Sequence, residues 1–139
     1  MTQEEKELLL KDLCGRLPYG VKCHIEDKNV KIIDGIIYDI DIDLSDSYYL
    51  ASFKTSEGFY SLVEFGWFKP YLRPMSSMTE EERTEYFILK HRDNDRDDNI
   101  ILVDEASTLI DWLNKKMFDY RGLIEKGLAL EAHEGMYNG

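Results

Sequence analysis

The sequence predicts one α+β domain, in which an antiparallel sheet of about four to five strands carries helices from both ends of the chain. Three observations favour this fold class. The 139 residues suit one domain, and 43% of them are hydrophobic. Helical patterns lie near the two ends of the chain, and short β-prone runs lie between them. No repeat or linker composition divides the chain, so we expect a single domain over residues 1–139.

The N-terminal segment predicts a helix over Thr2–Cys14. Thr2 and Glu5 have the spacing of a capping box, which satisfies free backbone amides at a helix start. Three leucines then recur at helical spacing and form one apolar face: Leu9, Leu10 and Leu13. Gly15 and Pro18 end the predicted helix.

The next segments predict strands. Val21–Glu26 alternates apolar and polar residues, as a half-buried strand does. Asp34-Gly35 lies between two isoleucine-rich runs and is a type I′ hairpin signal, so we expect a turn there and a separate strand at Ile36–Leu44. The alternative is one bent strand, which would put Asp34 on the apolar face. Alternation puts Ile36, Tyr38, Ile40, Ile42 and Leu44 on one face and Asp39, Asp41 and Asp43 on the other.

Two further β-prone runs, Tyr48–Lys54 and Phe59–Phe65, are separated by a hairpin-length loop. The aromatic segment Gly66–Pro74 contains prolines, which favour either an edge strand or an ordered loop. Thr79 and Glu82 form a second capping box and open a helix that leads into an acidic loop.

We expect the segment Ala106–Ala132 to lie across the core. Its first half carries apolar residues at helical spacing: Ala106, Leu109, Ile110, Leu113 and Met117. Asp104 has the N-cap position, and Lys115 and Lys116 complement the dipole in the last turn. Two glycines break the apolar second half into short pieces, and Glu131–Gly139 is expected to be a loosely held tail.

Two segments, Trp67–Glu80 and Asp111–Ile124, resemble a family of short uncharacterised proteins of gut Bacteroidetes genomes and their phage-like elements. The first segment begins Trp-Phe-Lys-Pro-Tyr and the second Asp-Trp-Leu-Asn-Lys-Lys. The resemblance implies a cytoplasmic protein of mobile-element origin, and it carries over no functional residue.

The acidic surplus is concentrated in two stretches. The net charge is −11, and residues 26–46 and 79–105 contribute −5 and −6 of it. Such a surface repels nucleic-acid phosphates and anionic membranes, so we expect neither as a direct ligand. No run approaches the roughly 18 apolar residues of a membrane span. The acidic N-terminus lacks the basic start of a signal peptide, so we expect a cytoplasmic protein with Cys14 and Cys23 as reduced thiols.

The acidic loop is a weak metal candidate. Asp93, Asp95 and Asp97 take positions 1, 3 and 5 of a calcium-loop template, and Asp104 takes position 12. Asp98 stands where the turn needs glycine, and position 12 lacks the usual glutamate, so a solvated loop is the preferred interpretation.

A second weak candidate is the strand face with Asp39, Asp41 and Asp43. Carboxylates about 6–7 Å apart along a strand can hold a divalent cation or share protons as a catalytic pair. The preferred interpretation is an exposed face that keeps a sheet edge soluble. The histidines are scattered and no nucleophile motif is present, so we predict neither a cofactor nor a catalytic site.

The aromatic segment is the predicted partner-binding surface, through Trp67, Phe68, Tyr71 and Arg73. Aromatic residues and arginine dominate interface hot spots, and these rings are too close in sequence for all of them to point inward. We therefore expect a small acidic, non-catalytic accessory or regulator that binds a protein partner or forms a homodimer. Two alternatives are a small enzyme or divalent-metal-binding domain that uses the clustered aspartates, and a nucleic-acid mimic.

Overall fold

The computed structural model of the chain describes residues 1–26, 32–43, 45, 48–92 and 103–137. These residues form an α+β fold of three α-helices and a six-stranded mixed sheet, which confirms the predicted class with one strand more than expected. The elements are α1 (Gln3–Arg16), β1 (Lys22–Ile25), β2 (Ile33–Asp43), β3 (Tyr48–Thr55), β4 (Gly58–Glu64), β5 (Phe68–Leu72), α2 (Glu80–Arg92), α3 (Val103–Lys115) and β6 (Leu130–Glu131).

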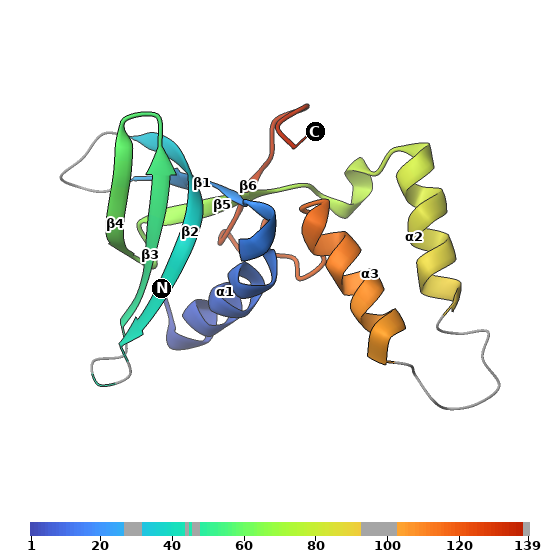
Figure 1. Cartoon of the computed structure of the whole chain (residues 1–139), viewed down its shortest axis with the longest axis horizontal. Coiled ribbons are helices and arrows are strands. Elements are labelled where there is room, and N and C mark those ends of the chain that lie inside the picture. The colour runs from blue at the N-terminus through green and yellow to red at the C-terminus, as the bar shows by residue number, and fades with distance from the viewer. Residues whose placement is uncertain (27–31, 44, 46–47, 93–102, 138–139) are drawn as a thin grey trace.

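The sheet has the strand order β4-β3-β2-β1-β5-β6, in which all neighbours are antiparallel except β5 and β6. We call its buried side the inner face and the opposite side the outer face. The inner face packs against α1 and the segment of residues 116–129. Figure 1 shows the sheet at one end of the molecule and α2 at the other, with α3 between α1 and α2.

The helix starts follow the local sequence. Both predicted capping boxes are confirmed: Thr2 and Thr79 each accept a hydrogen bond from the backbone amide three residues later, 3.1 Å away in each case. The first helix runs to Arg16 instead of ending at Gly15. A Cβ on Gly15 would lie 2.8 Å from the Asn114 side-chain nitrogen, so this glycine permits the close approach of α1 to α3.

The predicted turn at Asp34-Gly35 is wrong, because both residues lie within the single strand β2. The presence of glycine at position 35 is explained by packing between strands. A Cβ there would lie 2.9 Å from Thr55 Cγ2 and 3.2 Å from the Lys54 carbonyl oxygen, so the glycine lets β3 come close. The objection to one long strand also disappears, since Asp34 points to the outer face, opposite His24 of β1.

A β-bulge in β2 also overturns the predicted apolar face of Ile36–Leu44. The pairing with β3 shifts between Ile37 and Asp39, so one extra residue on β2 reverses the alternation. Ile37 is buried, whereas Ile36 and Tyr38 point outward and are 41% and 47% exposed. After the bulge, Ile40 turns inward and the three aspartates lie on the outer face with Ile36 and Tyr38.

The segment 106–132 contributes to the core as predicted, although its ends differ. Its helix begins at Val103, so Asp104 lies inside α3 and not at an N-cap. The second half has no helix, and it buries Met117, Phe118 and Leu123. These side chains join two clusters, a large one under the sheet and a smaller one of Met78, Leu113 and Phe118.

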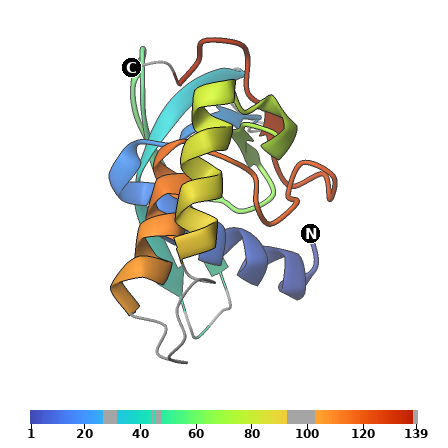
Figure 2. The ribbon, with the colours of Figure 1, turned by 90° about the vertical axis from the view of Figure 1, so that its right-hand side faces the viewer.

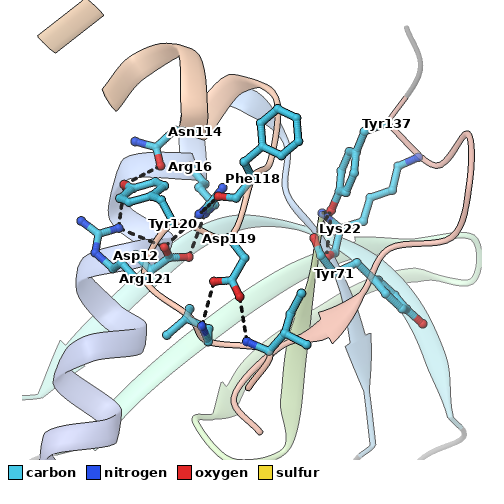
Figure 3. Close-up of polar contacts among 12 residues, drawn as sticks. Asp12, Arg16, Lys22, Tyr71, Asn114, Phe118, Asp119, Tyr120, Arg121 and Tyr137 are labelled. Carbon is cyan, nitrogen blue, oxygen red and sulfur yellow. Dashed lines mark hydrogen bonds and ion pairs between the residues drawn. The ribbon is translucent and has the colours of Figure 1, made fainter. Parts of the chain in front are cut away.

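A buried polar network ties α1 to this second half (Figure 3). Asp12 and Arg16 are fully buried and form a bidentate ion pair at 2.8 and 3.1 Å. Arg16 also donates to the Phe118 carbonyl oxygen at 2.7 Å, and Arg121 donates to Asp12 at 2.9 Å. Asp119 accepts bonds from two later backbone amides and so fixes the following turn.

The helix α2 packs mainly against α3, and Figure 2, which views the molecule from this end, shows α2 in front of α3. Trp112 donates to Glu85 at 2.8 Å, and Arg73 at the end of β5 holds Glu82 with two bonds of 2.8 and 2.7 Å. The opposite side of α2 leaves Phe87 and Ile88 exposed.

Candidate binding surface

The predicted partner-binding residues do not form one exposed surface. Phe68 and Tyr71 are buried, and Trp67 is half-buried against the large core cluster. Arg73 is held by Glu82, and its guanidinium lies 4.2 Å from the centre of the Phe118 ring. The reason is topological. The segment is not an edge strand, because β5 pairs with both β1 and β6, and other parts of the chain cover both of its faces.

The C-terminal segment provides the cover on the outer face, where we expected a loosely held tail. Residues 130–131 form β6, and the Tyr71 and His133 rings lie 5.6 Å apart. The Tyr137 hydroxyl accepts from the Lys22 amide at 2.9 Å and donates to the Tyr71 carbonyl oxygen at 2.8 Å. Lys22 Nζ donates to the Met136 carbonyl oxygen at 2.7 Å. Figure 3 shows Tyr137 beside Lys22 and Tyr71.

The candidate metal residues give no site in the described part of the chain. Asp93, Asp95 and Asp97 lie outside the described residues, and Asp104 lies within α3. The other three aspartates are exposed on the outer face of β2: Asp39, Asp41 and Asp43. Among the described residues, no group of three or more His, Cys, Asp or Glu side chains is placed to hold a metal ion.

The outer face of β2, β3 and β4 carries an exposed apolar surface that the sequence did not predict. Ile36, Lys54 and Phe59 lie side by side on the three strands, and Phe59 is 69% exposed. The Tyr38 and Phe59 rings meet edge to face with their centres 5.7 Å apart. We call Ile36, Tyr38, Lys54 and Phe59 the outer patch.

A cavity of about 320 Å³ adjoins the outer patch, and we call it the sheet pocket. It lies on the outer face between the strands and the C-terminal segment, and its wall is mainly apolar. Its lining residues are Lys22, Asp34, Gly35, Ile36, Lys54, Thr55, Ser56, Tyr71 and Met136. Ile36 and Lys54 belong to both the pocket and the patch, so the two form one continuous surface.

A polar cluster stands at one side of the sheet pocket. The Tyr71 hydroxyl donates to Asp34 Oδ1 at 2.9 Å, and His24 Nδ1 lies 3.0 Å from the same oxygen. His24 Nε2 lies 3.2 Å from Glu26 Oε1. Burial, and then the hydrogen bond to Asp34, raise the pKa of Tyr71 to about 12. The phenol is therefore a neutral donor at pH 7, and it fixes the position of the Asp34 carboxylate.

This cluster lacks the parts of a nucleophilic site. The two carboxylates lie at opposite ends of the imidazole, and the neighbouring hydroxyl is the protonated phenol of Tyr71. Cys23 points to the inner face, where burial raises the pKa of its thiol, so it is not a thiolate at neutral pH. Cys14 and Cys23 are both free thiols. The arrangement orders a carboxylate at the pocket wall and supplies no activated nucleophile.

Sequence reasoning missed this surface for one identifiable reason. The turn placed at Asp34-Gly35 separated Asp34 from the strand that follows it. An uninterrupted β2, paired with β1 as an antiparallel neighbour, puts His24 opposite Asp34. The signal available was the polar side of the first strand, where Lys22 and His24 alternate with buried residues.

Comparison of the chain with known protein families, with curated proteins and with solved structures gave no match. Within the described ranges, no helix has the length and apolar character needed to cross a membrane.

Proposed function

We propose that this protein is a non-catalytic accessory that binds a protein partner through the outer patch. The observation that carries the proposal is the exposure of Ile36 and Tyr38 on β2 together with Phe59 on β4, on either side of Lys54 of β3. Exposed aromatic side chains at the centre of a contact supply much of the binding energy in protein interfaces. Hydrogen-bonded strands fix the backbone that carries these side chains, so the outer patch loses little backbone entropy when a partner binds.

The charges around the patch define the partner's chemistry. The molecule carries a net charge of −11, yet Lys54 lies within the patch and Lys22 lies beside it. Within the described residues, the Lys54 ammonium has no hydrogen bond or ion pair. A partner segment that places an aliphatic or aromatic side chain beside an Asp or Glu would satisfy both the apolar rings and this cation.

Selection of peptides from a displayed random library tests the proposal without a known partner. We expect selected peptides to combine an apolar residue with a carboxylate and to lose binding at least about tenfold on Phe59→Ser. Phe87→Ser, which alters an equally exposed ring on α2, is the matched control and should leave binding unchanged. Peptides that bind both variants as well as the native chain would contradict a contact at the outer patch.

A second copy of the chain is the alternative occupant of the outer patch, and it must be distinguished from a different protein. The outer face puts Lys54 toward one end of β2 and Asp39, Asp41 and Asp43 toward the other, so a two-fold pairing would bring opposite charges together. Sedimentation velocity over a concentration series decides this point. A dimer that Phe59→Ser dissociates would identify the occupant as a second copy, and a monomer at all concentrations would favour a different protein.

A further inference from the structure

We infer that the sheet pocket receives a carboxylate carried on a short apolar stem, from the same partner segment that covers the outer patch. This inference rests on the proposed function, because the pocket and the patch share Ile36 and Lys54. The inference goes beyond the proposed function because it names the chemical group, a carboxylate, that the partner places in the sheet pocket.

The size and the wall of the pocket suit an apolar stem. A volume of about 320 Å³ lies at the lower end of the range of small-ligand sites, which is enough for one side chain or one chain terminus. Gly35 and Thr55 form part of the wall where β2 meets β3. Ile36 and Met136 supply apolar contacts from β2 and from the C-terminal segment.

The charged groups in the pocket favour an anion over a cation. Lys54 is free of partners among the described residues, and Lys22 uses one of the three donors of its ammonium on the Met136 carbonyl oxygen. The acid in the wall, Asp34, is drawn toward Tyr71 and His24, which both lie within 3.0 Å of its Oδ1 atom. An incoming carboxylate therefore meets ammonium donors, and such charge-assisted hydrogen bonds are stronger than neutral ones.

A second cavity, larger than the sheet pocket, offers no comparable site for an anion. It has a volume of about 410 Å³ and includes Arg73, but that guanidinium is already neutralised by the bidentate contact with Glu82. It has no free cation comparable to Lys54 among the residues that line it. The sheet pocket is accordingly the better site for an anionic group.

Hexanoate and its neutral isostere hexanamide are suitable probes, because they differ only in the charged head. We expect hexanoate to shift the backbone amide NMR signals of Gly35, Ile36 and Thr55, and to bind at least about fivefold more tightly than hexanamide. Lys54→Gln should remove this preference and Lys54→Arg should retain it. Lys69→Gln changes a lysine outside the pocket and serves as the control.

Equal binding of hexanoate and hexanamide, or a hexanoate preference that survives Lys54→Gln, would overturn the inference. An unchanged amide spectrum outside the pocket shows that each variant is folded. If hexanoate fails while selected peptides still depend on Phe59, the pocket assignment is wrong and the proposed function stands. If hexanoate binds as expected but peptide binding is independent of Phe59, the proposed function is wrong and the pocket remains an anion site.

The source of the carboxylate is decided with a selected peptide. Amidation of its C-terminus should abolish binding if the chain terminus enters the pocket. Replacement of its acidic side chain by the corresponding amide should abolish binding if a side chain enters. Binding that survives both changes would contradict the inference.

Discussion

Gly35 is required by a close contact and not by turn geometry, because its neighbours leave no room for a Cβ. The nearest atoms include the Lys54 carbonyl oxygen at 3.2 Å, which belongs to the backbone of β3 and cannot rotate away. Gly15 has an equally short contact at 2.8 Å, but there the neighbour is the end of the Asn114 side chain. A methyl group at position 15 is therefore accommodated by a movement of the Asn114 side chain, whereas one at position 35 requires a shift of the β3 backbone.

We predict that Gly35→Ala lowers the free energy of unfolding by roughly 1–3 kcal/mol, because β3 must move to accept the methyl group. Gly15→Ala should change it by less than about 1 kcal/mol, since the better helix propensity of alanine offsets a shift of Asn114. Urea unfolding of both variants measures the difference. An equal loss in the two would mean that the backbone contact at Gly35 has no special role.

Glu82 connects the pH dependence of stability to one ion pair. Its hydrogen bonds to Arg73, together with those from Thr79, lower the pKa of Glu82 to about 2 against the opposing effect of burial. A lowered native pKa stabilises the fold at pH values above the ordinary glutamate value of about 4.3, and this contribution disappears as the pH falls toward about 2.

We predict that Glu82→Gln lowers the free energy of unfolding by roughly 1–3 kcal/mol at pH 7, because the bidentate charged contact to Arg73 is lost. The difference from the native chain should shrink steadily below about pH 4.5. The exposed neighbour Glu81 gives the control, Glu81→Gln. A difference that stays constant from pH 7 to pH 3 would show that the charge of Glu82 is not the source of its effect.

At the scale of elements, α3 has one buried and one exposed apolar side. Leu113 packs with Met78 and Phe118, whereas Ile110, one turn earlier, is 41% exposed. We predict that Leu113→Ala lowers the free energy of unfolding by about 2–5 kcal/mol and that Ile110→Ala lowers it by less than about 1 kcal/mol. Thermal or urea unfolding compares the two. A small effect at Leu113 would make α3 peripheral to the fold.

The C-terminal segment is a second element with a defined attachment. We predict that Tyr137→Phe lowers the free energy of unfolding by about 1–3 kcal/mol, because it removes the hydroxyl that the Lys22 amide and the Tyr71 carbonyl both use. Hydrogen exchange at the Lys22 amide should accelerate, with little change at Phe53 in the centre of the sheet. Unchanged exchange at Lys22 would contradict the attachment.

The elements that the sequence predicted well depend on neighbours in the chain. Both capping boxes, the strand at Lys22–Ile25 and the hairpin of β3 and β4 follow from spacing, alternation and a short loop. The prediction for β2 failed because a glycine between two apolar runs has two possible causes, a turn or a close contact, and only the tertiary structure separates them. The bulge after Ile37 then moved two large apolar residues to the outer face.

The candidate site was harder to predict than the fold. Burial of Phe68 and Tyr71 depends on β6 and on the C-terminal segment, which are distant in sequence from β5. The exposed rings lie instead on β2 and β4, where nothing in the local pattern marks them. For the whole molecule, the net charge of −11 gives no indication that Lys54, which has no ion pair among the described residues, lies beside an apolar surface.

Mapping a selected peptide by amide-resolved NMR is the most direct test of the outer patch as the binding surface. We predict the largest shift changes at Ile36, Tyr38, Lys54 and Phe59 on the outer face of the sheet, and none at the exposed Phe87 of α2. Shift changes centred on α2, with the amides of β2, β3 and β4 unaffected, would contradict the proposed binding surface.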